Sequence, residues 1–106
     1  MQYPVTPDGR YFLVKGRLWR CTNPALHATT REKLVKQLMA ARRALKTVAR
    51  DKKSLKEARS VVHQVKEALG ERGPVWWNDG APDYSRKLAK NTPYAAWARV
   101  ASHSPN

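Results

Sequence analysis

The sequence predicts an α+β fold dominated by helices: an N-terminal β-hairpin, a long antiparallel helical hairpin, and an aromatic C-terminal segment with two short helices. Three observations predict it. Residues 1–24 combine aromatic and β-branched runs with turn signals, residues 29–70 repeat apolar side chains every three or four positions, and residues 74–101 place aromatic side chains among turn-forming ones. A chain of 106 residues suits a single domain, 1–106, with one modest core.

The first part of the chain is expected to form the β-hairpin. The stretch "TPDG" supplies a turn, because Pro7 fixes φ and Gly9 tolerates a positive φ. The run "RYFLV" follows, and "RLWRCT" comes after Lys15 and Gly16, which is typical of two strands around a two-residue turn. Lysine resists the left-handed conformation that such a turn needs, so a glycine bulge in one bent strand is the alternative.

The middle of the chain predicts two helices joined by the short connection "DKKS". Thr29 with Glu32, and Ser54 with Glu57, each have the spacing of a capping box at a helix N-terminus. Gly70 is expected to end the second helix in a left-handed conformation. The expected buried stripes are Leu34, Leu38, Ala41, Leu45 and Val48 in the first helix, and Leu55, Ala58, Val62, Val65 and Leu69 in the second. Because the connection is short, the helices should be antiparallel neighbours with facing stripes.

The segment 74–101 is expected to wrap the helical hairpin. One short helix is predicted over residues 81–90. A second is predicted to begin at Thr92, followed by Pro93, because the first residue of a helix does not need the backbone N–H that proline lacks. Both are expected to be short, since turn-forming residues surround them.

Trp76 and Trp77 are adjacent, so in an extended segment their side chains point to opposite sides. One indole is expected to anchor the core. The other either packs beneath the last helix or stays half exposed near cations, which makes Trp77, Arg86 and Lys87 the candidate residues for binding a protein partner.

The charge of the chain indicates an anionic partner. There are 21 Lys and Arg against 8 Asp and Glu, a formal net charge of +13. Such a charge attracts nucleic acid, acidic protein surfaces or anionic lipid. The candidate nucleic-acid-binding residues lie on the face of the first helix opposite its apolar stripe and at the tip of the helical hairpin: Lys33, Lys36, Arg43, Arg50, Lys52, Lys53 and Lys56. The alternative is a solvated surface that only keeps the protein in solution.

The β-hairpin offers a second arrangement of cations and rings. Arg and Lys residues alternate there with Tyr11, Phe12 and Trp19. Rings that face outward would form a surface of the kind that binds single-stranded nucleic acid. We instead expect the aromatic side chains to face inward and cover the helix pair, because the apolar stripes of that pair need a cover.

No catalytic or metal site is predicted. Cys21 is the only cysteine, which rules out an intrachain disulfide and suits a reducing cytoplasm. Cys21 and His63 could in principle meet as a nucleophilic thiol and its base, but a lone cysteine in a small domain is more often a packing residue. No HExxH, CxxC, nucleophile-elbow or phosphate-loop pattern is present. Asp79 and Asp83 flank a turn and could bind a divalent cation, but turn formation and helix capping already account for both. Neither an export signal nor a membrane-spanning run is recognisable.

The stretches "YPVTPDGRYFLVKGRLWRCTNP" and "GERGPVWWNDGAPDYSRKLAKNTPYAAW" resemble a family of small uncharacterised bacterial proteins of about this length. The likeness extends over nearly the whole chain. It implies a bacterial, stand-alone, intracellular protein and assigns no activity, cofactor or partner.

Two functions follow as expectations. The first is a small cytoplasmic protein, monomer or homodimer, that binds DNA or RNA without sequence specificity through phosphate contacts. The second is an adaptor or regulatory protein that binds an acidic protein partner. No enzymatic activity, cofactor or membrane association is expected.

Overall fold

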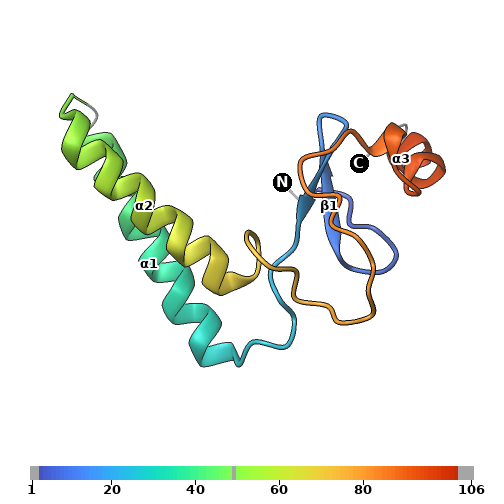
Figure 1. Cartoon of the computed structure of the whole chain (residues 1–106), viewed down its shortest axis with the longest axis horizontal. Coiled ribbons are helices and arrows are strands. Elements are labelled where there is room, and N and C mark those ends of the chain that lie inside the picture. Colours follow the sequence, from blue (N-terminus) through green and yellow to red (C-terminus); the bar gives the residue numbers. More distant parts are fainter. Residues whose placement is uncertain (1–2, 49, 103–106) are drawn as a thin grey trace. The chain divides into compact units, whose positions relative to one another are not determined.

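The computed structural model describes residues 3–48 and 50–102 (Figure 1). It confirms the predicted fold class, α+β with helices dominant. The elements in order are the strands β1 (Tyr11–Val14) and β2 (Arg17–Arg20), the helices α1 (Ala28–Thr47) and α2 (Lys52–Leu69), the 3₁₀ turn η1 (Ala89–Asn91) and the helix α3 (Ala95–Ser102).

The chain divides into two compact units. The β unit joins the first 21 residues to the segment from Trp77 onward, and the helical unit holds residues 22–76. Whether residues 1–106 behave as one domain stays a prediction.

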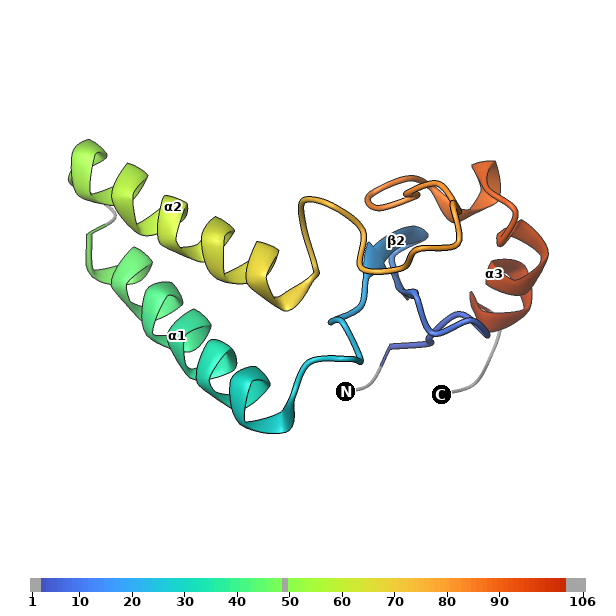
Figure 2. The same ribbon diagram turned by 60° about the horizontal axis from the view of Figure 1, so that its bottom comes forward.

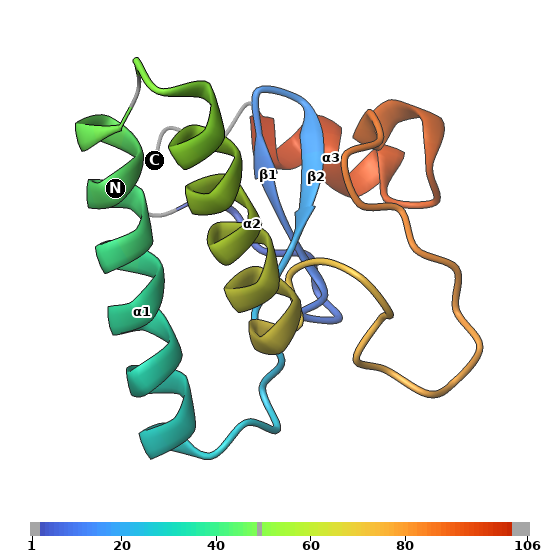
Figure 3. The ribbon, with the colours of Figure 1, turned by 60° about the vertical axis from the view of Figure 1, so that its left-hand side comes forward.

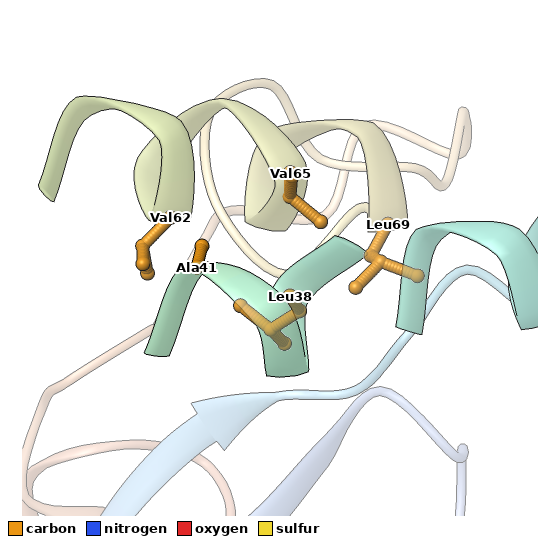
Figure 4. Packing of buried hydrophobic residues seen from close by; sticks show 5 residues of the cluster. All are labelled: Leu38, Ala41, Val62, Val65 and Leu69. Carbon is orange, nitrogen blue, oxygen red and sulfur yellow. The ribbon is translucent and has the colours of Figure 1, made fainter. Parts of the chain in front are cut away.

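The helical unit is an antiparallel pair in which α1 and α2 lie side by side (Figure 2). Its core consists of residues from the predicted stripes, which point toward one another across the pair (Figure 4): Leu38, Ala41, Val62, Val65 and Leu69. Leu26, Leu34 and Leu45 pack against this cluster and are partly buried. Burying a Leu or Val side chain is worth about 1.5–3 kcal/mol, so this seam is the main source of stability in the unit.

The helix starts differ from the predicted capping boxes. His27, not Thr29, is the N-cap of α1, and its Nδ1 accepts the Thr29 N–H at 3.2 Å. Asp51, not Ser54, is the N-cap of α2, and its carboxylate accepts from the Ser54 hydroxyl at 2.7 Å. Both helices begin two or three residues before the predicted cap, which leaves Thr29 and Ser54 inside the first helical turn.

Gly70 ends α2 as predicted, in the left-handed conformation with φ 86°. A Cβ at this position would lie 2.9 Å from Asn23 Cβ and 3.0 Å from Trp76 Cδ1. The Asn23 N–H also donates to the Leu69 carbonyl at 2.8 Å. The end of α2 and the segment that leads into α1 are therefore held together by a contact that only glycine allows.

The β unit is built on the predicted hairpin, in which β1 and β2 are antiparallel neighbours (Figure 3). Val14 pairs with Arg17, so the turn has two residues, and both Lys15 (φ 50°) and Gly16 (φ 82°) have positive φ. Positive φ at both positions is the requirement of a type I′ turn, which confirms the two-residue turn over the glycine bulge. Val5 forms an isolated bridge with Phe12 and extends the pairing beyond the two strands.

Tyr11 is the centre of the β-unit core and has no exposed surface. Its ring meets Trp77 edge-on at 5.6 Å and Tyr94 edge-on at 5.5 Å between ring centroids. Its hydroxyl accepts the Tyr84 N–H at 2.8 Å. Aromatic side chains of the C-terminal segment thus pack on the β-hairpin.

The helix predicted over residues 81–90 is absent apart from η1. The Asp83 carboxylate accepts the Ser85 N–H at 2.9 Å, and Arg86 has φ 69°, which a right-handed helix cannot contain. The Arg86 N–H donates to the Leu18 carbonyl at 2.7 Å, and the Leu18 N–H donates to the Lys87 carbonyl at 3.0 Å. The backbone of this segment therefore pairs with β2 instead of with itself.

The last helix is confirmed but starts later than predicted. It begins at Ala95, and the Thr92 hydroxyl accepts the Tyr94 N–H at 3.2 Å just before it. Thr92 also donates to the Ala89 carbonyl at 2.8 Å, which links α3 to η1.

Asp8 ties the first turn of the chain to the C-terminal segment. Its carboxylate accepts from the Thr6 hydroxyl at 2.6 Å and from the Tyr94 hydroxyl at 2.5 Å. Partial burial raises the pKa of Asp8, but the hydrogen bonds from Thr6 and Tyr94 outweigh it and bring the pKa below its ordinary value. Burial and the hydrogen bond to Asp8 raise the pKa of Tyr94.

We expect Gly70→Ala to destabilise the helical unit by about 3 kcal/mol, because the added Cβ combines a strained positive φ with a close approach to Asn23. Gly80→Ala is the matched control, since Gly80 has φ 82° but nothing within 4 Å of an added Cβ, and about 1 kcal/mol is expected. Urea denaturation measures both. Equal losses in the two variants would show that the contact with Asn23 contributes nothing.

We expect Asp8 to make the β unit sensitive to acid. A carboxyl whose pKa is lower in the folded than in the unfolded state stabilises the fold above about pH 4, and this contribution disappears as the pH falls further. The stability gap between the wild type and Asp8→Asn should therefore narrow between pH 6 and pH 2 in denaturant titrations. Tyr94→Phe should show a smaller change in the same direction. A gap that stays constant across this range would contradict the assignment.

Candidate nucleic-acid interface

The helical unit carries most of the excess positive charge. Twelve cations lie between residues 31 and 66: Arg31, Lys33, Lys36, Arg42, Arg43, Lys46, Arg50, Lys52, Lys53, Lys56, Arg59 and Lys66. Three carboxylates lie in the same stretch: Glu32, Asp51 and Glu57. Since the buried seam fixes how each helix is rotated, the direction of each cation follows from its position relative to that seam.

On α2 a row of basic side chains follows one flank of the seam. Its members recur at intervals of four and three residues, which keeps them on one side of a helix with 3.6 residues per turn: Lys52, Lys56, Arg59, His63 and Lys66. The buried residues Val62, Val65 and Leu69 lie about a quarter turn away around the helix axis. The row therefore runs the length of α2 beside its packed face.

On α1 the corresponding flank holds Arg31, Arg42 and Lys46, with two apolar side chains between them. These are Val35, 39% exposed, and Met39, 46% exposed. Both count among the large apolar side chains that the fold leaves in contact with water.

The two flanks face the same side of the helical hairpin. Viewed along each helix from its N-terminus to its C-terminus, the basic flank lies about a quarter turn from the buried seam, in the same rotational direction on both helices. Because the two helices are antiparallel and their seams face each other, the two flanks lie on the same side of the pair. We call this surface the basic face: Arg31, Arg42, Lys46, Lys52, Lys56, Arg59, His63 and Lys66. The opposite side of the hairpin carries small or uncharged side chains, such as Ala40, Ala44, Val61 and Ala68, with Lys33 and Glu57 as charged members.

At one end of the basic face, His63 lies between two charged groups. Its Nε2 is 2.6 Å from the Glu67 carboxylate, and its Nδ1 is 3.3 Å from the Arg72 guanidinium. Arginine can only donate a hydrogen bond, so Nδ1 faces a donor, whereas Nε2 faces a carboxylate acceptor. The permanent positive charges of the basic face are those of its Lys and Arg side chains.

The residues predicted from the sequence for nucleic-acid binding are all exposed: Lys33, Lys36, Arg43, Arg50, Lys52, Lys53 and Lys56. Within residues 3–48 and 50–102, none of these side chains forms an ion pair. Among the described residues, their charge is therefore not compensated by an ion pair.

The structure does not bring this predicted set onto one surface. Lys52 and Lys56 belong to the basic face, whereas Lys36 and Arg43 point away from α2 on the outer side of α1. Lys33 lies on the opposite side of the hairpin. Their role in binding stays a prediction, and so does that of Arg50 and Lys53.

Sequence reasoning passed over Arg31, Arg42, Lys46 and Arg59 because it looked opposite the apolar stripe rather than beside it. The signal was present in the spacing. On both helices, cations repeat every three or four residues beside the apolar stripe. Only the antiparallel pairing shows that these two rows form one surface.

Trp77, predicted for partner binding, is a core residue with 9% of its surface exposed. Its Nε1 donates to the Ala81 carbonyl at 2.8 Å, and the Arg10 guanidinium lies 4.8 Å from the centre of its ring. Arg10 in turn pairs with Asp79, which lowers the pKa of that carboxyl. The exposed indole expected at Trp77 is therefore not found, and Trp76 is the half-buried one of the pair.

Arg86 and Lys87, the other two residues predicted for partner binding, have exposed side chains. Their backbone pairs with β2, which fixes where the side chains begin. Binding through them stays a prediction.

Tyr11 is buried, but the rings that it meets, Trp77 and Tyr94, belong to its own unit. Trp19 is 38% exposed, so the inward orientation expected for it is wrong. Strand alternation explains the difference, because Tyr11 and its neighbour Phe12 lie on opposite faces of the hairpin and Phe12 pairs with Trp19. That the hairpin aromatics cover the helix pair stays a prediction.

The described parts of the chain hold no cluster of three or more His, Cys, Asp or Glu side chains that could bind a metal ion. Nor does any described helix combine the length and the apolar character needed to cross a membrane. Comparisons of the chain with protein-family models, with curated proteins and with solved structures found no match. The resemblance to a small bacterial family stays a prediction, and the function has to be argued from the geometry.

Proposed function

We propose that this protein binds nucleic acid without sequence specificity, through phosphate contacts made by the basic face of the helical hairpin. The observation that carries the proposal is the one-sided distribution of charge: both helices direct cations to the same side, and the other side is nearly uncharged. A surface that only improves solubility usually mixes both signs of charge.

The dimensions of the basic face suit a polyanion. Axes of packed helices lie about 8–10 Å apart, and successive members of the α2 row rise by about 4.5–6 Å along the helix. From Lys52 to Lys66 the row extends about 21 Å. A rigid array of this size can meet several phosphates of one strand or duplex at once, and each phosphate neutralised releases counterions.

Little has to be broken when the basic face binds. Within the described residues, six cations of this face make no ion pair: Arg31, Arg42, Lys46, Lys52, Lys56 and Arg59. Lys and Arg side chains on such a face contact the phosphate backbone, which positions a ligand without reading its bases. This supports binding that is independent of sequence.

A second candidate is an acidic protein partner. Val35 and Met39 lie exposed between the cations of α1, and an apolar strip flanked by positive charge is complementary to an acidic amphipathic helix. Met39→Ser separates the candidates: it should weaken a protein partner and leave binding to DNA or RNA unchanged.

We expect purified protein to bind DNA of arbitrary sequence, with an affinity that falls steeply as salt rises from about 50 to 200 mM. Fluorescence anisotropy with labelled duplexes of two unrelated sequences measures this, and both should bind alike. Absence of binding to either duplex at the lowest salt would eliminate the proposed function.

We expect the triple variant Arg42→Gln, Lys56→Gln and Arg59→Gln to reduce the slope of log affinity against log salt by about 2.7 for duplex DNA, which corresponds to three lost phosphate contacts. The matched control is Lys33→Gln, Lys36→Gln and Arg43→Gln, which removes the same charge from the other surfaces of α1. A much smaller change is expected in the control.

Two outcomes of this comparison would contradict the assignment to the basic face. Equal effects of the two triple variants would mean that only net charge matters. A larger effect of the control would place the contacts on the outer side of α1, where the sequence alone predicted them.

A further inference from the structure

The sheet of the β unit has one buried and one exposed face. Tyr11, Leu13, Leu18 and Arg20 alternate along β1 and β2 and are buried. The side chains between them point to the other face, where Phe12 pairs with Trp19 and forms a bridge with Val5. This outer sheet face therefore extends over three adjacent extended segments.

Aromatic rings lie on all three segments of the outer sheet face. Trp19 is 38% exposed and stands directly opposite Phe12. Tyr3 is 47% exposed, and its ring stacks on Phe12 with 6.0 Å between centroids and an interplanar angle of 26°. Exposure of large rings on one side of a small sheet is more than core packing requires.

A shallow apolar hollow opens on the same surface. It has a volume of about 490 Å³ and is lined by Tyr3, Val5, Phe12 and Cys21. Two of its four lining residues are aromatic, Tyr3 and Phe12, and their rings stack on one another at its edge. Trp19 lies beside Phe12 on the next strand.

The charged groups at this surface are cations. Arg17 occupies an outward position on β2, and its guanidinium donates to the Arg86 carbonyl at 2.8 Å, which holds it near the hairpin turn. Lys15 is exposed in the turn itself. The carboxylates of the described β unit are used elsewhere, because Asp8 bonds to Tyr94, Asp79 pairs with Arg10, and Asp83 pairs with Arg20.

We infer that the outer sheet face, with Tyr3, Phe12 and Trp19, binds unpaired bases by stacking, so that the preferred ligand is single-stranded nucleic acid. The inference rests on the proposed function, because the phosphates that accompany the bases are attracted by the same net charge of +13. Rings supply stacking that tolerates any base, and nearby cations hold the backbone. Bases inside a duplex have no free ring surface to offer, so the duplex should bind more weakly.

The test compares single-stranded and duplex DNA of twelve nucleotides or base pairs at the same salt, for the wild type and for two variants of Trp19. Trp19→Leu keeps an apolar side chain and removes the ring, and it should lower the affinity for the single strand roughly 5- to 100-fold while leaving the duplex unchanged. Trp19→Tyr restores a ring and should recover most of the loss. If Trp19→Leu lowers the unfolding midpoint, Tyr3→Ser repeats the test at a residue outside β1 and β2. It should also lower the affinity for the single strand and leave the affinity for the duplex unchanged.

The outcomes separate the two proposals. No binding of either ligand at low salt removes the proposed function and this inference with it. Equal binding of both ligands that is insensitive to Trp19→Leu leaves the phosphate contacts in place and overturns base stacking. A similar loss for both ligands in Trp19→Leu also overturns it, as does a dimer that dissociates in this variant, since the outer sheet face would then bind a second copy of the chain.

Discussion

The packing of α1 against α2 decides where each cation on these two helices points. Leu38 and Ala41 on one helix, and Val62, Val65 and Leu69 on the other, fix the rotation of both helices about their axes. The flanks that meet on one side are then set by the antiparallel direction of the pair, and the basic face is a consequence of that seam. Rotating one helix by one residue, or about 100°, would turn its cations away from those of the other helix.

The β unit obeys the same logic with a period of two. Tyr11 is held inside by Trp77, Tyr94 and the Tyr84 N–H, so the alternation of a strand sends Phe12 outward and, through pairing, Trp19 with it. In both units a buried apolar contact fixes where a polar or aromatic surface lies: beside the seam in the helical unit, and on the opposite face of the sheet in the β unit. We base the proposed function on those surfaces.

The elements were predictable because their signals are local: the apolar stripes of α1 and α2, the left-handed cap at Gly70 and the two-residue turn at Gly16. The misses have non-local causes. The segment around Arg86 pairs its backbone with β2 instead of forming a helix, and no local pattern announces that partner. The side of the sheet on which Trp19 lies depends on which face Tyr11 occupies, and the grouping of cations on two helices depends on the direction in which they pack.

Six cations of the basic face make no ion pair within the described residues, and this has a thermodynamic consequence: Arg31, Arg42, Lys46, Lys52, Lys56 and Arg59. Like charges held on one rigid surface repel one another, and this repulsion is absent from the expanded unfolded chain, so it lowers the stability of the free protein. A bound polyanion would cancel the repulsion as well as form contacts of its own. Folding and ligand binding are therefore linked, and the melting temperature of the helical unit becomes a report on how much of its charge is neutralised.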